Sequence, residues 1–117
     1  MYHETPNHPD IASTLNNLGL AWQVLGDARK AVSFYQRALA IKEQVYHETP
    51  NHPSIASTLN NLGLGRQALG DALQAVSFYQ RALKIYEQIY DIDHPYRAIV
   101  SKNFEIARCA LEKSQRH

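Results

Sequence analysis

The chain repeats itself nearly verbatim after 44 residues. When residues 2–44 are aligned with residues 46–88, only eight of the 43 positions differ. A third copy begins at His94, 42 residues after the equivalent His52, and stops near residue 117. Each unit of such an array buries its apolar face against its neighbours. The repeat therefore predicts a single solenoid domain over residues 1–117, with units at about residues 2–45 and 46–89 and a capping helix at about residues 94–114.

Each full unit has the pattern of two helices. Pro9 lies where a helix can begin, because a first-turn residue needs no N–H donor, and apolar residues then recur at helical spacing. Gly26-Asp27 combines a helix stop with an N-cap for a second helix. Helices are thus predicted from Pro9 to Gly26, at 28–45, from Pro53 to Gly70, at 72–89 and at 95–113. The predicted inward residues are Ile11, Leu15, Leu18 and Trp22 in the first helix, and Ala31, Tyr35, Ala38 and Leu39 in the second.

Glycine stands at the same position in the middle of both predicted first helices, where it costs about 1 kcal/mol relative to alanine. Gly19 and Gly63 are therefore expected where another helix approaches closely, with Ala31 and Ala75 as the matching flat surface. Glu105 stands at the third equivalent position. It predicts that no further helix packs there, and that the last helix acts as a cap.

The spacing of these residues resembles a known family. Leu15-x-x-Leu18-Gly19-x-x-Trp22, Gly26-Asp27 and Ala31-x-x-x-Tyr35-x-x-Ala38 resemble the tetratricopeptide repeat signature, and the second unit repeats it with Arg66 in place of the aromatic residue. The stretches HPDIASTLNNLGL and YQRALAI are most similar to the longer repeats of kinesin-light-chain type. HEAT and armadillo repeats share a period of about 40–47 residues, so the residue spacing, not the period, favours this family. The resemblance implies an all-α superhelix of antiparallel helix hairpins.

Composition disfavours several classes of function. Twelve basic and eleven acidic residues leave no strong positive charge to attract nucleic acid or an anionic membrane. No apolar run is long enough to span a bilayer. The single cysteine, Cys109, excludes an internal disulfide framework and suits the cytoplasm. It is expected to be packed or half-exposed within the last helix.

The repeated octapeptide YHETPNHP resembles the zinc-protease string H-E-x-x-H. That chemistry needs two histidines four residues apart on one helical face. Here His47 and His52 are five apart, and Pro50 between them prevents a helix. We interpret the segment as a joint between units, with histidines that are dispensable for folding. The sequence shows no nucleophile motif and no phosphate-binding loop, so we predict no catalytic residues, metal or cofactor, and no enzymatic activity.

The most informative polar residues are asparagines at equivalent positions of the first helices. The resemblance implies that these helices line a concave surface that binds an extended peptide or a partner helix. An amide both donates and accepts hydrogen bonds, so a column of amides can hold a peptide backbone. The same asparagines could instead bridge neighbouring first helices. The predicted peptide-binding residues are Asn16, Asn17, Leu20, Gln23, Asn60, Asn61, Leu64, Gln67, Lys102, Asn103 and Ile106, with Ser13, Ser57 and Cys109 on the same surface.

The alternative function is a structural unit that associates with its own kind. Ile11, Leu15 and the outer side of Trp22 are expected to lack cover at the first end of the array, and Ile99, Ile106 and Ala110 at the other. Exposed repeat ends predict weak homo-oligomers, by end-to-end stacking or as a two-fold dimer.

Overall fold

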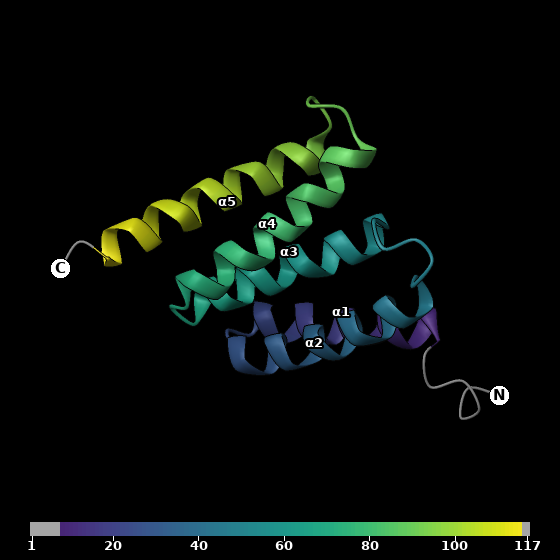
Figure 1. Ribbon diagram of the computed structural model, residues 1–117. Coiled ribbons are helices and arrows are strands. Elements are labelled where there is room, and N and C mark those ends of the chain that lie inside the picture. The colour runs from purple at the N-terminus through teal and green to yellow at the C-terminus, as the bar shows by residue number, and fades with distance from the viewer. Residues whose placement is uncertain (1–7, 116–117) are drawn as a thin grey trace.

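The computed structural model describes residues 8–115, which form five helices and no strand. The helices are α1 (Pro9–Val24), α2 (Ala28–Val45), α3 (Pro53–Ala68), α4 (Ala72–Ile89) and α5 (Pro95–Ser114). Figure 1 shows them stacked in chain order, with α1 and α2 forming one hairpin, α3 and α4 the next, and α5 following on α4. The predicted all-α solenoid of two and a half repeats is confirmed.

The turn inside each hairpin has the predicted Gly-Asp chemistry. Gly26 and Gly70 adopt left-handed conformations, with φ of 84° and 77°. The next amide, that of Asp27, donates to Trp22 O at 2.9 Å and closes the end of α1. The Asp27 carboxylate then accepts from the Lys30 amide at 3.1 Å and caps α2. A local sequence signal is sufficient here because every contact spans only a few residues.

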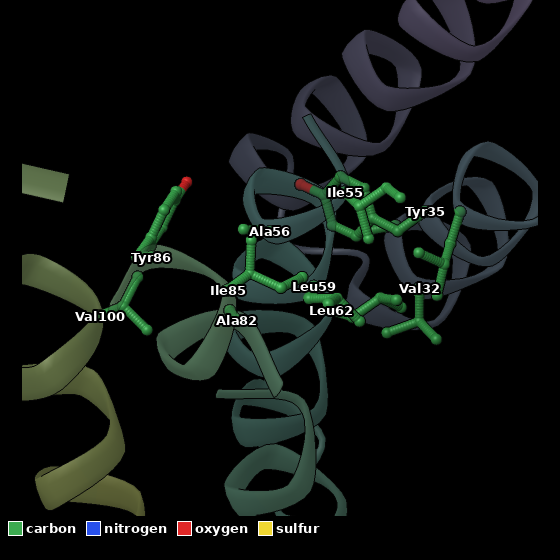
Figure 2. Packing of buried hydrophobic residues seen from close by; sticks show 12 residues of the cluster. Val32, Tyr35, Ile55, Ala56, Leu59, Leu62, Ala82, Ile85, Tyr86 and Val100 are labelled. Carbon is green, nitrogen blue, oxygen red and sulfur yellow. The ribbon is translucent and has the colours of Figure 1, made fainter. Parts of the chain in front are cut away.

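A continuous apolar core runs from α2 to α5, with α3 at its centre (Figure 2). The predicted inward residues of the second helix are all buried, and the Tyr35 ring is fully so. Buried residues from four helices therefore hold the two repeats and the last helix as one body. The core cluster consists of Ala31, Val32, Tyr35, Leu39, Ile55, Ala56, Leu59, Leu62, Ala82, Ile85, Tyr86 and Val100.

The mid-helix glycines do mark a close approach, but the neighbour is a tyrosine ring. A Cβ added at Gly63 would lie under 3.0 Å from three ring atoms of Tyr79, and one at Gly19 would meet Tyr35 in the same way. The predicted alanine surface was wrong in this respect, because the nearest atoms belong to the aromatic side chain one turn further along the second helix. Each hairpin therefore needs glycine so that the ring can lie against the α1 or α3 backbone.

The two first helices bury different residues, although their sequences are almost the same. Leu15 is only 6% exposed, so the expectation that it lacks cover was wrong: it lies on the same side of α1 as the buried Ala12 and Gly19. Leu18 is instead 41% exposed, whereas its equivalent Leu62 is fully buried. The difference arises because α2 packs on α3 at this position, while no described helix covers α1 there.

Histidines in the joints between units are the N-cap residues of the first helices. His8, His52 and His94 are the N-cap residues of α1, α3 and α5, and each Nδ1 accepts a hydrogen bond from the amide two residues later, at 3.0–3.2 Å. An imidazole nitrogen accepts in this way only when it carries no proton. The interpretation of these histidines as dispensable for folding stays a prediction, and the cap at His52 argues against it, because a helix start without a cap leaves its amides unpaired.

A tyrosine at the end of each second helix stacks on the capping histidine. The Tyr46 and His52 rings lie 3.8 Å apart at 11°, and the Tyr90 and His94 rings 3.7 Å apart at 7°. The stack is kept although the second joint is two residues shorter. It therefore ties the exit of one hairpin to the entry of the next helix at both joints. The first copy of the octapeptide lies mostly outside the described residues.

The last helix has one packed side and one charged side, as predicted for a cap. Val100 and Ala107 are buried against the preceding hairpin. On the other side, the Arg108 guanidinium contacts the carboxylates of Glu105 at 2.7 Å and Glu112 at 2.5 Å. The charged network keeps this side of α5 compatible with water.

We expect Gly63→Ala to destabilise the protein, although alanine favours helices. The added methyl group forces the Tyr79 ring to move in a packed core, and such overpacking costs about 1–3 kcal/mol. Denaturant unfolding monitored by circular dichroism measures the change. Ser57→Ala, at an exposed position of the same helix, is the control and should be neutral. An unchanged or raised unfolding midpoint for Gly63→Ala would contradict the close approach.

We expect His52→Ala to lower the free energy of unfolding by about 1 kcal/mol, the usual contribution of an N-cap. His52→Asn keeps a capping acceptor without the stacked ring, and His52→Phe keeps a ring without the acceptor. If the cap dominates, asparagine restores most of the lost stability in thermal unfolding and phenylalanine does not. Equal stability of the alanine variant and the parent would show that the cap contributes nothing.

Candidate functional site: the surface of the first helices

The first helices α1, α3 and α5 are joined side by side by asparagine pairs. Asn61 Nδ2 donates to Asn16 Oδ1 at 3.2 Å, and one repeat further on Asn103 Nδ2 donates to Asn60 Oδ1 at 3.1 Å. In each pair, the acceptor is the first asparagine of an Asn-Asn doublet, Asn16 or Asn60, and the donor stands at the second position of the next first helix. The structure thus contains the bridging role that the sequence left open as an alternative to peptide contact.

A buried lysine extends the first bridge, and sequence reasoning did not identify it. Lys42 is 7% exposed, and its ammonium donates to Thr58 Oγ1 at 2.7 Å and Ser54 O at 3.1 Å. Thr58 Oγ1 in turn donates to Asn16 Oδ1 at 3.4 Å. Burial lowers the Lys42 pKa, and no carboxylate of the described residues lies within ion-pair distance of it. One signal was available: Lys42 lies four residues after Ala38 on the inward stripe of its helix.

The two predicted glutamines are held by the tyrosines that cross the glycines. Tyr35 Oη donates to Gln23 Oε1 at 2.6 Å, and Tyr79 Oη donates to Gln67 Oε1 at 2.8 Å. Burial raises the pKa of both tyrosines to about 12, so their hydroxyls keep the donated proton at neutral pH. The same ring that sets the hairpin distance therefore also orients a polar side chain of the predicted surface.

An apolar column runs beside the asparagines. Leu20 is 41% exposed, Leu64 is half-buried, and Ile106 is 49% exposed. Asn17 and Lys102 are exposed on the same helices. Cys109 is also exposed, so the expectation that it is packed or half-exposed was wrong. The surface therefore offers one apolar residue and one or two amides per first helix.

A cavity of about 420 Å³ opens between α3 and α5. Tyr86 of α4 contributes one wall. Of this lining, Ser57 and Asn60 belong to the surface predicted from the sequence, and the other residues do not, because the cavity depends on how three helices meet. The lining residues are Pro53, Ser54, Ser57, Asn60, Tyr86, Tyr96, Ile99 and Val100.

The aromatic residues around this cavity form one cluster. The Tyr86 ring centroid lies 5.5 Å from that of Tyr90 and 6.1 Å from that of Tyr96, and His94 meets Tyr96 edge-on at 5.1 Å. Burial, with a smaller effect of Tyr90 and Tyr96, raises the pKa of Tyr86 to about 12. Tyr86 is therefore a neutral hydrogen-bond donor at physiological pH.

Neither a cluster of metal ligands nor a membrane-spanning helix is found among the described residues. Among residues 8–115, no three His, Cys, Asp or Glu side chains come together where they could hold a metal ion. His47 is exposed and contacts Glu48, while His52 is used as the cap. None of the described helices is both long and apolar enough to cross a bilayer.

The helix hairpins, their Gly-Asp turns and the amide-lined first helices define a helical-repeat protein of the tetratricopeptide class. Two family models, each described as Tetratricopeptide repeat, match residues 11–54 and residues 48–116, and the second alone covers more than half of the chain. The chain therefore belongs to the tetratricopeptide-repeat family, whose repeats generally mediate protein–protein interaction. No curated protein matches it.

Proposed function

We propose that the protein is a non-enzymatic scaffold whose first helices form a concave surface that binds an extended peptide or a helix of a partner protein. The proposal rests on the column of asparagine side chains along the first helices. The bridge from Asn61 to Asn16 uses one of the two N–H groups of Asn61, so the side chain keeps further donors and acceptors. Asn17 occupies the position of α1 that corresponds to Asn61 of α3. It is exposed and makes no hydrogen bond with the described residues.

The kind of repeat and the location are part of the same proposal. The period of 44 residues and the long second helices support a kinesin-light-chain type of repeat. One unpaired, exposed cysteine suits a reducing compartment, which supports a cytoplasmic location. The near balance of charges supports a protein or peptide partner and disfavours nucleic acid and membranes.

Panning a library of random peptides against the purified protein tests the proposal. We expect Asn17→Ala to weaken the selected peptides by about 1 kcal/mol, the contribution of one hydrogen bond, with an unchanged unfolding midpoint. Asn61→Ala should weaken binding similarly but should also lower stability, because it removes a bridge to α1. Calorimetry gives the affinities and thermal unfolding gives the stabilities.

The comparison of the two variants separates peptide contact from bridging. If Asn61→Ala lowers stability while neither substitution changes peptide affinity, the asparagines are structural only. Peptides that bind equally well to a variant with both substitutions would place the binding surface elsewhere.

The second candidate function is self-association, and one observation favours it. Leu18 is 41% exposed while its equivalent Leu62 is fully buried by the neighbouring repeat. The exposed side of α1 therefore has the residues of an interface that the second repeat uses internally. A second copy of the chain could cover this side.

We expect sedimentation velocity to show a shift from monomer to dimer between micromolar and near-millimolar protein. Leu18→Gln should weaken this association, because it replaces the apolar residue at the centre of the exposed side, while Val24→Gln, at the 87% exposed end of α1, serves as a control. A single monomeric species at all concentrations would contradict this function.

A further inference from the structure

The two joints between first helices have diverged at the same four places. At the joint of α1 and α3, these places hold one long cation and three small polar residues, Lys42, Ser54, Ser57 and Thr58. At the joint of α3 and α5 they hold Tyr86, Tyr96, Ile99 and Val100, which line the cavity of about 420 Å³. This change replaces a polar joint by an aromatic and aliphatic one.

The cavity has an apolar rim and one unused donor. Tyr96 is 56% exposed and Ile99 is 54% exposed at its mouth. Tyr86 is only 4% exposed, and its hydroxyl has no hydrogen-bond partner among the described residues. Figure 2 shows the Tyr86 ring extending away from Val100 with its oxygen at the far end. The hydroxyl itself is not cut off from solvent, so it can donate to an acceptor from outside the chain that enters the cavity.

We propose that this cavity is the seat for one aliphatic side chain of an extended partner peptide, whose backbone carbonyl accepts a hydrogen bond from the Tyr86 hydroxyl. The inference rests on the proposed peptide-binding function and adds its main specificity. The cavity, at about 420 Å³, has room for an aliphatic side chain together with part of the peptide backbone. The cavity also borders Asn60, which bridges to Asn103, so a peptide along the amide column passes directly over it.

The other joint cannot take the same residue. The Lys42 side chain lies across it and donates to Ser54 and Thr58. The Lys42 ammonium is already buried without a carboxylate partner among the described residues, and an aliphatic group there would remove its remaining contact with water, which is unfavourable. One joint therefore accepts an aliphatic residue and its neighbour does not. This difference fixes the register of a peptide on a surface whose asparagines are otherwise repeated.

Methyl NMR with N-acetyl-leucinamide as the probe tests the seat without a known partner. The probe carries one aliphatic side chain and two amide carbonyls, and N-acetyl-serinamide is its polar control. We expect the leucine probe to shift the methyl signals of Ile99 and Val100, and the serine probe to leave them unchanged. Equal shifts with both probes, or shifts that are larger at Val32 than at Val100, would overturn the proposal.

The other repeat supplies matched substitutions. Tyr96→Ser and Ile99→Ser together introduce the residues found at the first joint, in positions that are already exposed. We expect them to abolish the shift of Val100 by the leucine probe and to keep the helical spectrum. Ser77→Ala, at an exposed position of α4, should keep the shift. Tyr86→Phe retains the ring and should weaken binding of the probe severalfold by removing the donor. A Val100 shift that persists in the serine double variant would refute the seat.

Peptides selected from the library separate this inference from the proposed function. If both hold, the peptides share an aliphatic residue at one position, and the serine double variant weakens them about tenfold or more. If they depend on Asn17 and Asn61 but tolerate the double variant, the scaffold function stands and the seat fails. If no peptide is selected although the leucine probe still shifts Val100, the cavity binds an aliphatic group, but the scaffold function fails and with it the assignment of the cavity to a partner peptide.

Discussion

The crossing of a tyrosine ring over a glycine sets the geometry of each hairpin. Tyr79 lies against the backbone of α3 at Gly63, closer than any side chain there would allow, and Tyr35 does the same at Gly19. The short distance lets the tyrosine hydroxyl reach Gln67 or Gln23 on the surface of the first helices. A tightly closed hairpin is also what brings buried residues of four helices into one core. The packing of the interior and the orientation of the surface glutamines therefore depend on the same contact.

The joints between hairpins use a different set of contacts, and the two joints differ from each other between the first helices. Capping histidines and their stacked tyrosines are common to both described joints and tolerate a change of two residues in length. The surface between the first helices does not stay constant: Lys42 makes one joint polar, and Tyr86 leaves an aromatic cavity at the other. A duplicated scaffold can thus gain specificity by a few substitutions at joints, because the hairpins themselves supply the stability.

Much of the fold could be predicted because its signals are local. Helix starts at proline, stops at glycine and caps at Asp27 or Asp71 involve residues a few positions apart, and the structure places them as expected. Leu15 and Leu18 were harder, since periodicity assigns both to one face. The position of Leu18 is covered only where a preceding hairpin packs on the first helix: α2 packs on α3 and Leu62 is buried, whereas no described helix precedes α1 and Leu18 stays exposed.

The helices, their order, the family and the column of asparagines could all be predicted from the residues alone, because repetition and short-range helix rules require no knowledge of distances between distant residues. What those residues touch depends on the tertiary structure. The Asn61–Asn16 bridge joins positions 45 residues apart, and the contact of Lys42 with Thr58 depends on how the second hairpin is placed on the first. The cavity beside Tyr86 likewise exists because three helices meet around it. Such contacts follow from the relative placement of whole helices, which no local pattern encodes.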